Sequence, residues 1–322
     1  MSGGDLKSMR DVFLERIHAA MRQHDDIFLV SDDFGSRVLD KIRADFGDRF
    51  INVGIAEQNC INVAAGLALE GFNVYAYGIA CFMSMRSFEQ IRVNVAMTSQ
   101  LRPMNLNIVG VGAGMSYDVS GPTHHCLEDL SIIRTLPHIE LHSPSDATVA
   151  AAMVDGALDR AVPKYFRFDG KPLPILALEV LPAEVARGFR VLRAGRFLIL
   201  STGYMTHKAL KVAAAMPPGS VGVVDLTRFR PLDRQALAQA LAGAAGVMTL
   251  EEGFLGAGGL DALAATLLRE AGLAVPLCCQ GIRDRYLFEV GGREALHTSA
   301  GLSVDALCNA IRQALSAAVE PS

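Results

Sequence analysis

Residues 50–80 read FINVGIAEQNCINVAAGLALEGFNVYAYGIA, and this stretch decides the fold class. The apolar run 50–53 is typical of a buried strand, and the alanine-rich residues 56–69 predict a helix that ends before Gly71. Residues 73–79 then predict a second strand. Because a helix separates two strands that are apolar along their length, the stretch indicates a parallel sheet buried on both faces.

The same alternation continues on both sides of this stretch. Residues 6–22 have helical spacing and lead into the apolar run 27–30. Pro144 and Ser145 precede an alanine-rich segment, which predicts a helix over 146–161 with Ser145 as its N-cap. The other elements expected in this half are a helix over 82–98 and strands over 106–112 and 164–168.

A proline-rich segment divides the chain. Residues 171–188 contain three prolines and follow no clear period, so we expect a linker there. The alternation then restarts and closes with an amphipathic helix over 303–317, for which Ser303 is the expected N-cap. We therefore predict two three-layer α/β/α domains, residues 1–185 with the linker and residues 186–322. The strands expected in the second half are 196–202, 220–226 and 247–251, and its other helices are 206–216, 233–241 and 259–271.

The composition argues against some classes of function before any motif is considered. The 322 residues include 34 Asp and Glu against 30 Lys and Arg, a net charge of −4 that argues against a nucleic-acid partner. No run of about 18 apolar residues occurs, and the first residues lack the apolar core of a signal peptide, so we expect no membrane partner. The six cysteines include no C-x-x-C pair, which favours a reducing, cytoplasmic location.

Glu57 is the first candidate site residue. Ligands of open α/β sheets bind beyond the carboxyl ends of the strands, and Glu57 follows the strand 50–53 and opens the next helix. A carboxylate in the first helical turn is also favourable on electrostatic grounds alone, by a few tenths of a kcal/mol to about 1 kcal/mol. From the residues by themselves, Glu57 is either a helix-stabilising acid or a functional one.

A second candidate is the Gly-Pro turn that carries His124 and His125. Adjacent imidazoles in such a turn suit proton transfer near neutral pH, or they are surface side chains without function. Neither a His-x-x-x-His spacing nor a nearby set of Cys or Glu ligands accompanies them. We therefore expect no metal site here.

Two further segments combine apolar and charged residues. Residues 80–86 place aromatic, sulfur and arginine groups at a strand-to-helix junction, where they line a planar ligand or belong to the core. Arg167 lies in the apolar strand 164–168 and needs an anion; Asp169 or an acid of the second half could satisfy it without a ligand. The glycine motifs that bind dinucleotides or phosphates, and the G-x-S-x-G elbow, are absent.

Several motifs in a fixed order give the chain a specific resemblance. FINVGIAEQNCINVAAGLALEGFNVYAYGIACFMSMRSFEQIRVNVA, followed by GPTHHCLEDLSIIRTLP and SPSD, resembles the pyrimidine-binding domain of thiamine-diphosphate enzymes of the transketolase group. DLTRFRPLD, TLEEGFLGAGG and the ending LFEVGG with GLSVDAL resemble the transketolase C-terminal domain. The resemblance covers roughly residues 10–315 and is nearest to the C-terminal subunit of split bacterial transketolases.

The resemblance implies a fold, a cofactor and a partner. It implies a parallel sheet in the first domain, a mixed sheet in the second, and thiamine diphosphate as the cofactor. The family's Gly-Asp-Gly…Asn motif, which holds Mg²⁺ and the diphosphate, is missing, and Gly47-Asp48-Arg49 does not match it. An N-terminal-type transketolase subunit carrying the diphosphate and Mg²⁺ site is therefore implied as the partner, in an α₂β₂ assembly.

The resemblance also assigns roles to residues of this chain. Glu57 matches the catalytic glutamate that hydrogen-bonds N1′ of the aminopyrimidine. Phe82 matches the aromatic that stacks on the pyrimidine, although Met83 takes that place if the alignment slips by one. His124 matches the catalytic histidine beside the reacting carbon, and Arg167 an arginine that binds the donor phosphate. The residues implied at the cofactor are Glu57, Phe82, Arg86 and Ile55, and those implied at the substrate are His124, His125, Arg167 and Ser120.

Two departures from the family bear on the substrate. Val119 and Ser120 stand where transketolases have an acidic pair that contacts the donor, and Val111-Gly112 replaces a Thr-His pair that contacts phosphate. We therefore expect transfer of a two-carbon ketol or acyl unit from a donor other than a standard pentose phosphate, such as a 2-oxoacid or an unusual sugar. The alternatives are the β subunit of a 2-oxoacid dehydrogenase and a non-catalytic copy that binds a partner without cofactor.

Overall fold

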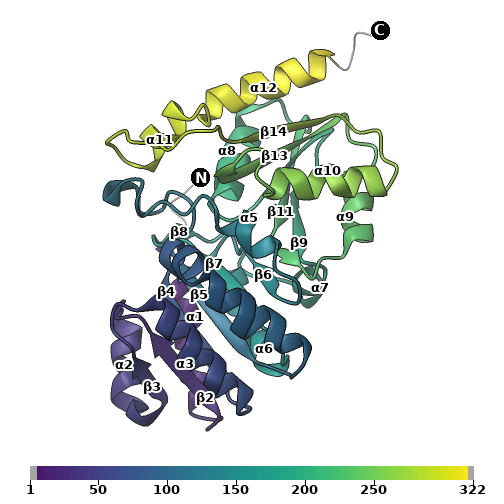
Figure 1. The fold of residues 1–322 in the computed structure, drawn as a ribbon. Coiled ribbons are helices and arrows are strands. Elements are labelled where there is room, and N and C mark those ends of the chain that lie inside the picture. The colour runs from purple at the N-terminus through teal and green to yellow at the C-terminus, as the bar shows by residue number, and fades with distance from the viewer. Residues whose placement is uncertain (1–5, 318–322) are drawn as a thin grey trace.

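The computed structural model describes residues 6–317 and contains two large β-sheets, each with helices on both faces (Figure 1). The seven-stranded sheet has the order β12-β6-β7-β5-β4-β2-β3, and the five-stranded sheet has the order β14-β13-β10-β11-β9. The chain thus forms two three-layer α/β/α units, as the sequence predicts. A two-stranded ribbon also pairs β1 (Leu6–Lys7) with β8 (Leu173–Pro174) in antiparallel fashion.

The first sheet is parallel in every strand that the first half supplies. Along the interior strand over residues 73–79, Tyr75 and Tyr77 pack under one helical layer, and Val74 and Ala76 pack under the other. Both faces are therefore buried, as the unbroken apolar pattern predicts. The strands are β2 (Ile27–Ser31), β3 (Phe50–Asn52), β4 (Asn73–Ile79), β5 (Leu106–Val111), β6 (Glu140–His142) and β7 (Lys164–Phe168).

Two helical layers cover this sheet. One layer consists of α1 (Met9–Met21), α2 (Arg37–Asp45) and α6 (Ala147–Asp159), and the other contains α3 (Glu57–Leu69) and α5 (Asp129–Arg134). The helix predicted over 82–98 is present in this second layer but is irregular. It consists of π-helical turns over Phe82–Arg86 and Ile91–Met97, the short α4 (Phe88–Gln90), and a 3₁₀ turn over Thr98–Gln100.

The second sheet is mixed, because β9 runs antiparallel to β11 while the other pairs are parallel. On one face α8 and α12 pack against the sheet, and on the other α9 and α10 do so. The strands are β9 (Phe189–Arg193), β10 (Phe197–Ser201), β11 (Val221–Leu226), β13 (Gly246–Phe254) and β14 (Leu277–Ile282). The helices are α8 (Tyr204–Ala215), α9 (Arg234–Leu241), α10 (Leu260–Glu270), α11 (Arg293–Ser299) and α12 (Val304–Ala317).

Two sequence predictions need correction. The N-cap of α6 is Asp146, whose carboxylate accepts from the backbone N–H groups of Thr148 and Val149, and not Ser145, whose hydroxyl donates to Asp225 at 2.6 Å. The first helix begins after residues that form β1, so the predicted helix over 6–22 is shorter. The expected linker 171–188 contains β8 and the short helix α7 (Pro182–Arg187), and its role as the linker stays a prediction.

The two halves are joined by more than the linker. The strand β12 (Arg228–Arg230) comes from the second half and pairs antiparallel with β6 at the edge of the first sheet. Nearby, the buried Arg190 donates to Asp225 at 2.8 Å and to the Ser145 hydroxyl at 2.9 Å, so a charged cluster spans the junction. One apolar cluster also includes residues from helices of both halves. The edge of the first sheet at β6 therefore lies against the second half.

Candidate active site

Glu57 lies at the start of α3, at the carboxyl edge of the first sheet, and is 2% exposed. Its two carboxylate oxygens accept hydrogen bonds from Nη1 of Arg86, at 3.0 and 2.8 Å. Arg86 ends the π-helical turn that follows β4, and 51% of its side chain is exposed. The structure thus brings together two residues that are 29 positions apart and that the resemblance placed at the cofactor.

Phe82 and His124 join this pair. The guanidinium of Arg86 lies 4.9 Å from the centre of the Phe82 ring, and the His124 ring meets Phe82 edge-on at 5.3 Å. The hydroxyl of Thr123 is 3.1 Å from Nδ1 of His124. Met83 is fully buried in the core, so Phe82 rather than Met83 belongs to this group. An acid, a cation, an aromatic ring and an imidazole therefore meet at one edge of the sheet.

Asp32 is a neighbour that the sequence motifs did not identify. It follows the end of β2 and is 6% exposed, and its Oδ1 atom has no hydrogen-bond partner within the described residues. Burial, and then repulsion from Glu57, raise the pKa of Asp32 to about 7. The signal in the sequence was a pair of acids directly after the strand 27–30, the position at which ligands meet an α/β sheet.

Three other predicted residues differ in exposure. Ile55 is 81% exposed, and Ser120 is exposed as well. His125 is buried, and neither of its ring nitrogens has a partner within the described residues. Burial lowers the pKa of His125, which favours a neutral ring. The contact of Ile55 with the cofactor, and those of Ser120 and His125 with the substrate, stay predictions.

Arg167 is already paired. Its Nε atom donates to both carboxylate oxygens of Asp129, at 3.0 and 2.8 Å, and both side chains are buried. The acid that satisfies Arg167 is therefore neither Asp169 nor a residue of the second half. Because the pairing neutralises the guanidinium, it weighs against a role for Arg167 in holding a phosphate, and that role stays a prediction.

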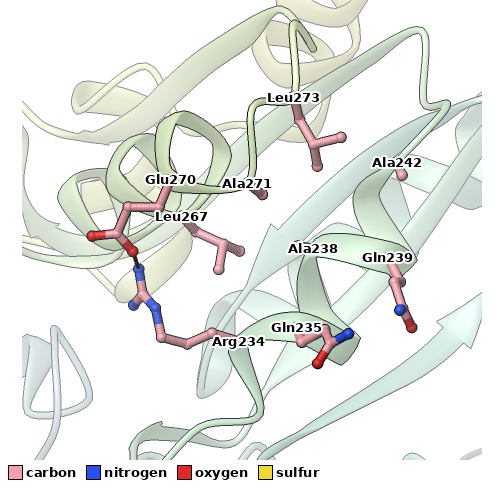
Figure 2. A pocket seen from close by; sticks show the side chains of 9 residues that line it. All are labelled: Arg234, Gln235, Ala238, Gln239, Ala242, Leu267, Glu270, Ala271 and Leu273. Carbon is pink, nitrogen blue, oxygen red and sulfur yellow. Dashed lines mark hydrogen bonds and ion pairs between the residues drawn. The ribbon is translucent and has the colours of Figure 1, made fainter.

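A separate groove of about 400 Å³ lies in the second half, between α9 and α10 (Figure 2). Its apolar floor includes Ala238 and Leu267, and an ion pair between Arg234 and Glu270 crosses one end at 2.5 Å. None of the predicted site residues lines it. The groove therefore has no part in the chemistry of the carboxyl edge.

Residues 6–317 contain no group of three or more His, Cys, Asp or Glu side chains arranged to hold a metal ion. In the same part of the chain, no helix has both the length and the apolar character that a membrane span needs.

Two family models match the chain, one for each half. The model described as "Transketolase, pyrimidine binding domain" matches residues 6–174, and "Transketolase, C-terminal domain" matches residues 190–307. The fold and the acid at the carboxyl edge thus define a two-domain α/β protein of this type. The chain belongs to the transketolase family.

Several curated relatives are subunits of transketolases. The chain is 28% identical over 306 residues to one subunit of the "Apulose-4-phosphate transketolase" of Actinobacillus succinogenes, covering 93% of this chain and 96% of the relative. It is 28% identical over 308 residues to "6-deoxy-6-sulfo-D-fructose transketolase subunit SqwH" of a Clostridium species, covering 95% and 94%. A solved structure titled "Split gene transketolase, inactive beta4 tetramer" matches with a TM-score of 0.83 at 28% identity, covering 96% and 98% of the two chains.

These relatives agree with the main sequence prediction, a C-terminal (β-type) transketolase subunit, and not with the β subunit of a 2-oxoacid dehydrogenase.

Proposed function

We propose that this chain binds the aminopyrimidine end of thiamine diphosphate, as the β-type subunit of a transketolase-like transferase. The observation that carries this proposal is the buried carboxylate of Glu57 at the first turn of α3, beside Phe82 and His124. A helix N-terminus by itself stabilises an acid, so the position of Glu57 alone does not indicate function. The aromatic ring and the imidazole beside it are what favour a binding site. The match to the pyrimidine-binding family supports the cofactor.

The residues present fit this cofactor. An aminopyrimidine offers ring nitrogens and an amino group to hydrogen-bonding partners and a flat face to an aromatic side chain. Glu57 supplies a carboxylate, Phe82 supplies a half-buried ring, and Asp32 has a buried oxygen without a partner among the described residues. When bound, thiamine diphosphate supplies a carbon nucleophile and stabilises the carbanion formed from the donor.

The chain's own residues then act on the cofactor and the substrate. Glu57 shares a proton with N1′ of the pyrimidine, and its oxygens, which accept from Nη1 of Arg86, keep further lone pairs for this contact. Phe82 orients the ring by stacking, worth about 0.5–1.5 kcal/mol beyond area burial. His124, held through Nδ1 by the Thr123 hydroxyl, moves a proton to and from the substrate oxygen.

We infer that a second chain completes the site. Three relatives that match along 94–96% of their length are named as subunits rather than as whole enzymes. This supports an N-terminal-type transketolase subunit that holds the diphosphate and Mg²⁺, in an α₂β₂ assembly. The six cysteines are all unpaired, which supports a reducing, cytoplasmic setting.

We also infer a donor other than a standard pentose phosphate. Val119 and Ser120 are exposed where the family has acids, and Asp129 neutralises Arg167. The relatives' names specify apulose 4-phosphate and 6-deoxy-6-sulfofructose, both unusual sugars. A donor screen with the assembled enzyme tests this inference, and a clear preference for xylulose 5-phosphate would contradict it.

The cofactor proposal is tested by calorimetric titration of thiamine diphosphate and Mg²⁺ into the chain, with and without its partner chain. We expect tight binding only with both chains present, and binding weakened at least about tenfold by Phe82→Ala. Phe88→Ala is the matched control, since Phe88 is a partly buried aromatic in the same layer that packs into the core. Binding that is equal in wild type and Phe82→Ala would refute the assignment.

A further inference from the structure

The segment that carries His124 leaves β5, folds back on itself as a loop and leads into α5. Gly114 and Cys126 exchange backbone hydrogen bonds at 3.0 and 2.8 Å, and this pair closes the base of the loop. We call residues 115–125 the histidine loop. Its remaining internal backbone bonds are short-range turns, such as His124 N–H to the Gly121 carbonyl at 3.0 Å. The outer part of the loop therefore depends on contacts from elsewhere.

Those contacts come from the second half. Glu252, in β13, accepts a hydrogen bond from the backbone N–H of Met115 at 3.2 Å. Asp118, farther along the loop, accepts one from the backbone N–H of Arg293 at 2.7 Å. Glycine at 114 permits this approach, because a Cβ there would overlap Oε2 of Glu252 and because φ is +58°.

Arg293, at the start of α11, connects these contacts. Its Nε and Nη2 atoms donate to the two carboxylate oxygens of Glu252, at 2.7 and 2.5 Å, and Nη1 donates to Asp169 at 2.5 Å. The guanidinium also stacks on the ring of Tyr204 at 3.6 Å. Arg293 is 6% exposed, so a fork of fixed geometry holds the Glu252 carboxylate in one orientation.

The charges around this centre are nearly balanced. Asp118 accepts from Nζ of Lys171 at 2.6 Å, and Nε2 of His297 lies 2.6 Å from Glu252. Three buried carboxylates thus face Arg293, Lys171 and an imidazole. Removing one member leaves another charged side chain without its partner, so the arrangement is specific and not generic packing.

We propose that Arg293 is a positioning residue for the histidine loop: through Glu252 and Asp118 it holds the loop in place, so that His124 meets Phe82 at the carboxyl edge. The proposal rests on the proposed function for its consequence, since the position of His124 matters to a reaction at that edge. The contacts by which Arg293 holds the histidine loop, which we call the tether, belong to this chain alone. They are therefore tested without cofactor or partner.

The test measures hydrogen–deuterium exchange and histidine NMR on the isolated chain. In Arg293→Lys, which keeps the charge but loses the fork, and in Asp118→Asn, we expect amides of residues 115–124 to exchange at least about tenfold faster. The His124 ring signal should move toward its unstructured position, because it loses the ring current of Phe82. Exchange in β4 and β5 should stay unchanged. If Arg293→Lys fails to fold, Asp118→Asn decides the question.

Glu294→Gln is the matched control. Glu294 is the next residue of α11, and its carboxylate accepts from Nζ of Lys208 at 2.6 Å and from the Tyr204 hydroxyl at 3.1 Å. A glutamine oxygen can still accept from Tyr204, so this variant removes the charge of Glu294 without freeing the ring that stacks on Arg293. The proposal is overturned if neither variant alters exchange or the His124 signal, or if Glu294→Gln alters them as much. A failed cofactor titration leaves this result untouched, so the tether and the proposed function fail separately.

Discussion

The guanidinium of Arg86 binds both carboxylate oxygens of Glu57, and the two side chains differ sharply in exposure, 51% against 2%. The acid is buried while its cation reaches solvent. A buried carboxylate with a solvent-exposed partner can exchange that partner for a ligand more readily than one held by a buried cation. This contrast separates Glu57 from Asp129, whose arginine is itself buried.

Glu57→Gln should abolish most turnover of the enzyme assembled with its partner chain. An amide cannot share a proton with the pyrimidine as a carboxyl does, so we expect less than about a tenth of the wild-type rate, a barrier increase above about 1.4 kcal/mol. Circular dichroism should show an unchanged fold. Glu89→Gln is the control, because Glu89 is an exposed acid of the same helical layer. A Glu57→Gln enzyme that retains more than this rate would remove Glu57 from the mechanism.

Asp32→Asn should change the pH dependence of stability. The carboxyl titrates near pH 4 in an unfolded chain, and burial and repulsion from Glu57 raise its pKa to about 7 in the folded protein. The folded state therefore binds a proton that the unfolded state has lost, and the free energy of unfolding falls as pH rises from about 4 to 7. Asp32→Asn has no carboxyl at this position, so its free energy of unfolding should not fall in this way as pH rises.

Urea unfolding at pH 4, 6 and 8 measures the effect. The free energy of unfolding of Asp32→Asn, taken relative to that of wild type at the same pH, should rise by about 2–4 kcal/mol between pH 4 and pH 8. The neighbouring exposed acid gives the control Asp33→Asn, which should follow the wild-type curve. Parallel curves for wild type and Asp32→Asn would show that Asp32 titrates normally.

Gly78→Ala should displace Asp32 and so disturb the candidate active site. A Cβ at this position of β4 would overlap Oδ2 of Asp32 and would lie 2.8 Å from Met83, so the acid must move. We expect a loss of about 1–3 kcal/mol in thermal or urea unfolding, together with weaker cofactor binding. Gly66→Ala, in α3 with open space around it, should instead stabilise by about 0.5–1 kcal/mol. Equal melting temperatures for the two variants would contradict the crowding at Gly78.

The buried pair Arg167–Asp129 should prove structural. Asp129→Asn leaves a buried guanidinium without its counter-charge, which costs about 3–5 kcal/mol of unfolding free energy. The double variant Asp129→Leu with Arg167→Met should recover much of this loss. The exposed pair at the α9–α10 groove gives the contrast, since Glu270→Gln should cost no more than about 1 kcal/mol (Figure 2). A small effect for Asp129→Asn would restore Arg167 as a candidate for substrate binding.

Much of the fold was predictable because burial patterns are local. The strands at 50–53 and 73–79 and the helix between them appear within about one residue of their predicted ends. Helix termini were harder, as Ser145 shows: it has the right chemistry for an N-cap, but its hydroxyl donates to Asp225 from the other half, and Asp146 caps the helix instead. The boundary between the predicted domains stays a prediction.

The candidate site was also predictable only in part. Glu57, Phe82, Arg86 and His124 were chosen from motifs, and they meet in space. Asp32 was missed, because acids after a strand are a weak signal until the structure places Glu57, from another strand end, beside one of them.

By itself, the sequence determined the alternation of strands and helices, the parallel first sheet, and the strand ends that hold the candidate site, because side-chain periodicity and turn chemistry act over a few residues. Only the tertiary structure decided that Asp129 neutralises Arg167, that β12 crosses into the first sheet, and that Arg293 reaches the histidine loop. These depend on which distant side chains share a low-dielectric interior, where each buried charge requires a partner that spacing along the chain does not reveal.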